Sequence, residues 1–282
     1  MQNIENEKTV KQDEGRLAVI EKIRKLEAEG VFDVDVEDDP PTIPLVPEKV
    51  DYLKEKVSSK IKTAFVNRVA KKYIDNLIRD KKLIIKNVEG MENLVNLNCG
   101  AVIICNHFNA FDNFAIQKIY ELSGQEKKRK LFKVIREGNY TSYKGLYGTF
   151  FRNCNTLPLS SIYSTMKKFN SAVKKILERG DYILIYPEQA MWWNYKKVRP
   201  FKIGAFDMAA KNNVPVLPIF ISFEDSDIMG EDGFYVQEYT LHIMPPVYPK
   251  EEFTAKDNAA YMLETSYNLF KSKYAEAYGE EL

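Results

Sequence analysis

The sequence predicts an α/β protein: a central, mostly parallel or mixed sheet flanked by helices, with an N-terminal helical annex. Short apolar runs at 101–105 and 182–186 have the length and the β-branched content of buried strands. Helix-like patterns separate them, and this alternation is typical of α/β folds. The chain has 282 residues, 45% of them hydrophobic, which is enough for one large core.

The first 47 residues form the first predicted segment. Residues 1–15 are polar, and we expect them to be frayed. Residues 16–29 place Leu17, Ile20 and Ile23 on one stripe before Gly30, which predicts a short amphipathic helix. Residues 33–47 are acidic and rich in proline, so they cannot be helical and are predicted to be an extended linker.

Residues 48–82 form a second segment, predicted to be helical and strongly basic. Apolar residues such as Val57, Ile61 and Phe65 recur at steps of three and four. A basic amphipathic helix suits the surface of an anionic membrane leaflet. The alternative is a helix packed on the domain with its lysines in water, and the sequence leaves both open.

Residues 83–282 alternate between strands and helices and form the third segment, the α/β domain. The expected strands are 83–86, 101–105, 131–135, 156–159, 182–186, 216–221 and one or two within 234–244. The expected helices are 113–121, 164–179, 201–212 and 258–274.

Composition narrows the class of protein. The net charge of +1 predicts no particular partner, and Cys99, Cys105 and Cys154 lack metal-site spacing. No apolar run approaches the roughly 18 residues of a membrane span, and the N-terminus has no basic-then-apolar signal. We therefore expect a cytoplasmic protein, peripheral on the inner face of the membrane.

The segment Asn106-His107-x4-Asp112 lies where a strand gives way to a helix, an edge at which α/β proteins display reactive groups. If the intervening loop folds back, Asp112 can accept the Nδ1 proton of His107 and leave Nε2 as a general base. No serine or cysteine is clearly placed as a nucleophile. The alternative is a histidine that merely caps a helix, with Asp112 as the helix N-cap.

Three further stretches accompany this one along the chain: Phe151-Arg152 after the strand-like run from Gly148, Pro187-Glu188, and 199–206 leading to Val214-Pro-Val-Leu-Pro218. In order and spacing, the four resemble the motifs of the glycerolipid acyltransferase family. The first matches its His-x4-Asp motif, and the resemblance covers roughly residues 83–250.

The resemblance implies acyl transfer from a thioester donor, acyl-CoA or acyl-carrier protein, to the hydroxyl of a lysolipid. The leading acceptor is 1-acylglycerol 3-phosphate, which would give phosphatidate. His107 would be the general base, oriented by Asp112. The residues expected to bind substrate are Asn106, Arg152, Glu188, Arg199 and Lys202. No resident cofactor, metal or nucleic-acid partner is expected.

The sequence departs from the family where Gln189-Ala190-Met191 replaces Gly-Thr-Arg. The arginine credited with holding an acceptor phosphate is absent, and Lys196, Lys197 or Arg199 could replace it. Trp192 and Trp193, which follow, are either membrane-interface anchors or core residues. A thioester hydrolase that uses the same His-Asp pair, and a non-catalytic lipid- or nucleotide-binding protein, remain as alternatives.

Overall fold

The short apolar runs form the middle of a mixed seven-stranded sheet in the computed structural model, which describes residues 11–281. The strands lie in the order β1-β7-β6-β2-β5-β3-β4. They are β1 (Ile84–Glu89), β2 (Ala101–Cys105), β3 (Leu131–Ile135), β4 (Thr156–Pro158), β5 (Tyr182–Ile185), β6 (Val216–Met229) and β7 (Tyr235–Ile243). The five strands from β6 to β4 are parallel, β7 is antiparallel to β6, and β1 is parallel to β7.

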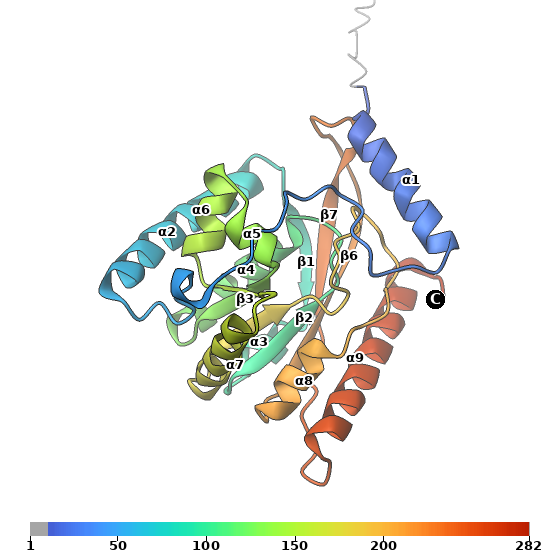
Figure 1. Ribbon diagram of the computed structural model, residues 1–282. Helices are drawn as coiled ribbons and strands as arrows, with labels where there is room; N and C mark the ends of the chain where they lie inside the picture. The colour runs from blue at the N-terminus through green and yellow to red at the C-terminus, as the bar shows by residue number, and fades with distance from the viewer. Residues whose placement is uncertain (1–10, 282) are drawn as a thin grey trace, which may run out of the picture.

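Helices cover both faces of this sheet, which confirms the predicted α/β class (Figure 1). The helices are α1 (Glu14–Ala28), α2 (Val57–Arg79), α3 (Met91–Val95), α4 (Asp112–Leu122), α5 (Glu137–Thr141), α6 (Gly145–Asn153), α7 (Tyr163–Glu178), α8 (Gly204–Lys211) and α9 (Ala255–Tyr278), with short 3₁₀ turns at Pro47–Lys49 and Gln125–Lys127. Helices α7, α8 and α9 pack on one face, and α2, α3 and α4 pack on the other.

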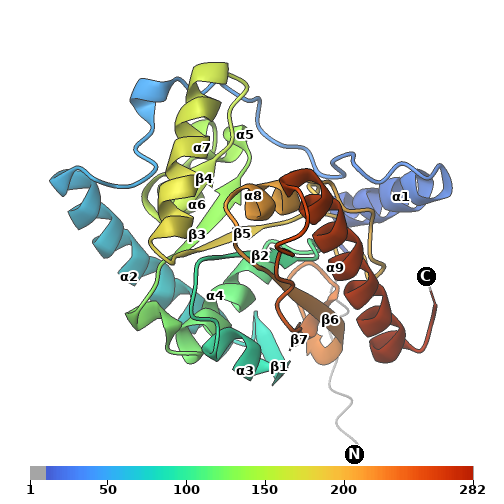
Figure 2. The same cartoon turned by 90° about the horizontal axis from the view of Figure 1, so that it is seen from below.

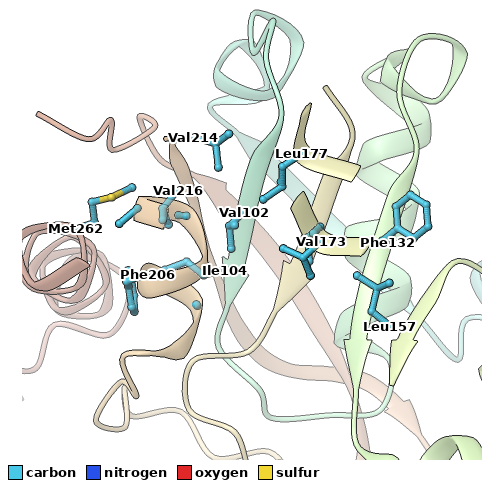
Figure 3. Close-up of a cluster of buried hydrophobic side chains, with 14 of the residues drawn as sticks. Val102, Ile104, Phe132, Leu157, Val173, Leu177, Phe206, Val214, Val216 and Met262 are labelled. Carbon is cyan, nitrogen blue, oxygen red and sulfur yellow. The ribbon is translucent and has the colours of Figure 1, made fainter. Parts of the chain in front are cut away.

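The alternation of side chains along the strands divides the core in two. Val102 and Ile104 of β2 point to the face covered by α7, α8 and α9, where they meet Val173, Phe206 and Met262 (Figure 3). Ile103 and Cys105 point to the opposite face, beneath α4. Because β2 is buried on both sides, its sequence is a continuous apolar run rather than an alternating one.

Several predicted boundaries need correction. The run Gly148–Arg152, predicted to be strand-like, lies in helix α6. The helix predicted over 48–82 occupies only Val57–Arg79. Strand β6 continues eight residues beyond the predicted end at 221, because its polar half pairs with β7. The segment 234–244 forms one strand.

The acidic segment is extended, as predicted, but it is docked on the domain rather than being a loose linker. It joins α1 to α2, which lie on opposite sides of the molecule (Figures 1 and 2). Leu45 is buried, and its N–H donates to Glu137 Oε1 at 2.7 Å. We call residues 33–39 the acidic arm; its carboxylates form ion pairs with Arg136, Lys202 and Arg16.

Candidate active site

His107 and Asp112 face each other across the turn that leaves β2. The chain folds back after Cys105, so that Nδ1 of His107 lies 2.7 Å from Oδ2 of Asp112. A carboxylate only accepts, so the proton of this hydrogen bond belongs to Nδ1, and Nε2 carries the lone pair. Within residues 11–281 no group is hydrogen-bonded to Nε2, and His107 lines a cavity.

Asp112 is completely buried at the start of α4, yet four donors surround it. Besides His107, the backbone N–H groups of Phe108 and Asn109 donate to Oδ2 at 3.2 and 3.3 Å. The hydroxyl of Tyr186 donates to Oδ1 at 2.7 Å. These bonds replace the water that a buried carboxylate loses, and they fix its orientation toward the imidazole.

Tyr186 was not identified from the sequence. Its ring stacks on that of His107, with centroids 3.9 Å apart and planes 16° apart. Burial, reinforced by the charge of Asp112, raises the pKa of Tyr186 well above its usual range, so its hydroxyl remains a donor. The sequence feature that could have identified Tyr186 is its position directly before Pro187-Glu188, at the end of β5, the strand next to β2.

Glu188 and Arg199 form a buried ion pair beneath the His107 loop, with Nη2 of Arg199 2.8 Å from Oε2 of Glu188. Glu188 Oε2 also accepts the N–H of His107 at 3.0 Å. Arg199 donates to the carbonyl oxygens of His107, Ala190 and Phe32. Both side chains are at most 2% exposed, so they hold the loop in place and do not line the cavity.

Asn106, also expected to bind substrate, is buried and pairs with the backbone of β6. Its Nδ2 donates to the carbonyl of Ile221 and its Oδ1 accepts the N–H of Ile221, both at 2.9 Å. This pairing fixes the point where the chain leaves β2, one residue before His107.

Arg152 does not join His107 in the site, because it lies on helix α6 and not at the end of a strand. Its Nη1 donates to the carbonyl oxygens of Tyr140 and Tyr143 at 3.2 and 2.8 Å, and it does not line the His107 cavity. Lys202 does line that cavity, at its mouth, where it pairs with Asp33 at 2.8 Å. Lys196 and Lys197 do not line it.

Trp192 and Trp193 are both buried, which decides between the two alternatives in favour of core residues. Trp192 packs with Phe32 and Val36, and its Nε1 donates to the carbonyl of Val34 at 2.9 Å. The guanidinium of Arg16 lies over Trp193 at 4.8 Å. The altered third motif therefore forms the surface on which α1 and the acidic arm dock.

The cavity that contains His107 has a volume of about 1140 Å³. One end lies at the acidic arm, where Asp33, Asp35 and Asp39 face Arg136 and Lys202. The other end runs between α2, α4 and α6 and is rich in apolar side chains. These include Ile74, Phe114, Leu131, Tyr147 and Phe150. A cavity of this size and shape has room for a lipid.

Lys133 is a further residue of this cavity, and it was not identified from the sequence. It interrupts the apolar strand β3, and its Nζ donates to the backbone carbonyl and to Oδ1 of Asn113 at 3.2 and 3.3 Å. Burial lowers the pKa of Lys133 to about 8. The one available signal was a lysine at the centre of a strand that is otherwise apolar.

Cys105 and His242 lie outside this machinery. Cys105 is fully buried, and burial raises the pKa of its thiol well above the usual range, so it is a poor nucleophile. His242 is buried between Ser222 and Glu89, at 2.9 and 2.7 Å. Among residues 11–281, no cluster of three His, Cys, Asp or Glu side chains has the geometry of a metal site.

In the part of the chain that the structure describes, every helix is too short or too polar to cross a bilayer. No curated protein matches the chain. Residues 85–222, about half of the chain, match the family model described as Acyltransferase. The match begins in β1, ends in β6, and includes His107, Asp112, Tyr186 and Glu188. Over residues 85–222, just under half of its length, the chain is therefore similar to the acyltransferase family.

Proposed function

We propose that the protein transfers a fatty acyl group from acyl-CoA or acyl-carrier protein to the hydroxyl of a lysolipid, with 1-acylglycerol 3-phosphate as the acceptor and phosphatidate as the product. The observation that supports this most is the 2.7 Å contact of His107 with Asp112 at the wall of a large, partly apolar cavity. The acyltransferase family match supports the same type of chemistry.

In the proposed reaction, Nε2 of His107 removes the proton of the acceptor hydroxyl as its oxygen attacks the thioester carbonyl. Asp112 holds the imidazole in the required tautomer and stabilises the imidazolium that forms. The tetrahedral intermediate then collapses: its C–S bond breaks, and the thiolate leaves with the proton from Nε2. Backbone N–H groups near the start of α4 are the proposed donors to the oxyanion.

The apolar part of the cavity is the proposed place for an acyl chain. Phe114 of α4, Phe150 of α6 and Ile74 of α2 line it. Each buried methylene contributes about 0.8 kcal/mol, so a long chain supplies much of the binding energy. Remote binding energy of this kind can be used to position the reacting groups.

Helix α2 is proposed to lie on the inner leaflet of the membrane. Its inner face buries Val66, Ile74 and Leu77 against the domain. Its outer face exposes an apolar stripe with a spacing of four residues, Val57, Ile61, Phe65 and Val69. Exposed cations flank the stripe: Lys56, Lys60, Lys62, Arg68 and Lys72. An apolar stripe between cations matches an anionic bilayer surface better than it matches water.

The buried pair Glu188–Arg199 and the side chain of Asn106 are proposed to position the His107 loop rather than to contact the acceptor. Each of them hydrogen-bonds the backbone of that loop or the strand beside it. Lys202, at the mouth of the cavity, is the one predicted substrate-binding cation that lines it. Its partner, Asp33, would compete with an incoming anionic head group.

The proposal is tested by incubating the purified full chain with acyl-CoA and acyl-carrier-protein donors and a panel of lysolipids, with mass spectrometry of the products. We expect an esterified lipid, and consumption of the donor that depends on the acceptor. Release of free fatty acid at the same rate with and without acceptor would instead identify a thioester hydrolase.

A further inference from the structure

Two of the cations that line the cavity, Arg136 and Lys202, form ion pairs with the acidic arm. At the mouth, Nη1 of Arg136 lies 2.8 Å from Asp35 and 2.5 Å from Asp39, and Lys202 pairs with Asp33. These carboxylates of the acidic arm already neutralise both cations. An anion that binds there has to displace the acidic arm. The ion pairs lost with the arm reduce the net free energy of binding that the anion gains.

Lys133 is in a different situation. No carboxylate in residues 11–281 lies within ion-pair distance of its Nζ, whose two hydrogen bonds both go to Asn113. An ammonium group has three N–H donors, so one remains available. Leu131 and Phe114 line the same cavity as this amine. The charges of Asp112 and Glu121 offset only part of the cost of burying this ammonium, and an anionic ligand in direct contact with it would compensate for more.

The position of Lys133 relative to His107 supports a role in substrate binding. Asn113, its hydrogen-bond partner, directly follows Asp112 in the first turn of α4. Lys133 therefore lies beside the first turn of α4, which begins with Asp112, the partner of His107. In 1-acylglycerol 3-phosphate only two carbons and one oxygen separate the free 2-hydroxyl oxygen from phosphorus. A phosphate near Lys133 would keep that hydroxyl close to His107.

We propose that Lys133 binds a phosphate group of the substrate inside the cavity and that it, rather than the paired cations of the mouth, selects for a phosphate-bearing ligand. This inference rests on the proposed function, since it assigns the head-group site of the same cavity. The same phosphate chemistry occurs in the phosphopantetheine of the donor.

The test is calorimetric binding to the full chain, which requires no turnover. The probes are a short-chain 1-acylglycerol 3-phosphate, the matched monoacylglycerol without phosphate, and phosphopantetheine. We expect Lys133→Met to weaken at least one phosphate probe by about tenfold or more and to leave the monoacylglycerol within about twofold. Lys133→Arg should restore most of the lost affinity. If the affinity for 1-acylglycerol 3-phosphate falls, the bound phosphate belongs to the lipid. If the affinity for phosphopantetheine falls, it belongs to the donor.

Lys54 provides a matched control. It lines the same cavity, burial lowers its pKa, and its Nζ donates to the backbone carbonyl of Arg152 at 3.1 Å, at the end of α6. We expect Lys54→Met and Arg136→Gln each to change phosphate affinity less than Lys133→Met does. Equal losses for Lys54→Met and Lys133→Met, a larger loss for Arg136→Gln, or no loss for Lys133→Met would overturn the proposal.

The binding result and the reaction can fail separately. If Lys133 controls phosphate affinity but no acyl transfer is found, the phosphate site stands and the proposed reaction is wrong. If transfer is found but Lys133→Met binds the phosphate probes as tightly as the unmodified protein does, the reaction stands and this inference is wrong.

Discussion

The hydroxyl of Tyr186 donates to Oδ1 of Asp112 at 2.7 Å, while the other oxygen of that carboxylate receives Nδ1 of His107. Since the ring of Tyr186 also stacks on the imidazole, a single side chain contacts both members of the pair. Tyr186 thus fixes the separation and the orientation of two groups that come from a loop and a helix.

Replacing Tyr186 by Phe should therefore lower kcat while leaving the stacking intact. A hydrogen bond to a charged group contributes about 1.5–3 kcal/mol, so we expect kcat to fall about tenfold with little change in KM. The measurement is steady-state acyl transfer.

Tyr182→Phe is the matched control, because Tyr182 lies in the same β5 region and donates to the carbonyl of Leu97 at 2.8 Å, away from the site. The Tyr182→Phe protein should be less stable than the unmodified protein but should have the same kcat. If Tyr186→Phe has the kcat of the unmodified protein, the hydroxyl has no role in positioning Asp112.

Replacing Glu188 by Gln should destabilise the fold, because it leaves the guanidinium of Arg199 buried without its counter-charge. Breaking one partner of a buried pair costs about 3–5 kcal/mol, and the glutamine oxygen can recover part of this by accepting hydrogen bonds. We expect a loss of about 2–4 kcal/mol in the free energy of unfolding from urea denaturation. Asp207→Asn, which breaks the exposed pair with Lys211, should change it by less than about 1 kcal/mol. Equal effects of the two changes would contradict a buried structural pair.

Helix α2 gives a prediction for membrane binding. Ile61 and Phe65 are 67% and 65% exposed, and inserting each into a bilayer contributes about 1.5–3 kcal/mol. Phe65→Ser should therefore weaken cosedimentation with anionic vesicles by about tenfold. Tyr163→Ser on α7, where Tyr163 is 85% exposed, should have no such effect. Identical sedimentation of both variants and the unmodified protein would place the membrane contact elsewhere.

Lys133 gives a prediction for how the stability of the fold depends on pH. Burial lowers its pKa in the folded state to about 8 from the usual 10.5, and the neighbouring Asp112 and Glu121 of α4 and Cys154 after α6 only partly oppose this. The unfolded chain then binds the proton more tightly, so this lysine destabilises the fold fully below about pH 8 and not at all above about pH 10.5.

Lys133→Met should consequently be more stable than the unmodified protein at pH 7, by about 1–3 kcal/mol. The difference should shrink as the pH rises toward 10. The free energy of unfolding of both proteins, measured across this range, checks the prediction. A difference that is constant with pH would show that the lysine titrates normally.

The sequence predicted the elements whose pattern is local. The bounds of 101–105 and 131–135 agree with β2 and β3, because both runs are short and contain β-branched residues, which favour a strand. The run Gly148–Arg152 was assigned wrongly, because a few apolar residues fit a strand and a helix equally well. Only the packing of α6 against α2 decides between them.

The candidate site was predicted in part for the same reason. The His107–Asp112 contact could be anticipated because both residues lie in one turn. Tyr186 and Lys133 enter the site from neighbouring parallel strands, β5 and β3, whose order in the sheet no local pattern reveals. The docking of the acidic arm on Trp192 likewise joins residues more than 150 positions apart.

The central claim is that His107 acts as the base in acyl transfer, and the most direct test is the rate of His107→Ala with a thioester donor and 1-acylglycerol 3-phosphate. We expect a loss of about 10²–10⁴-fold, with an unchanged circular dichroism spectrum and melting temperature. A folded His107→Ala protein that transfers acyl groups at the full rate would contradict the account.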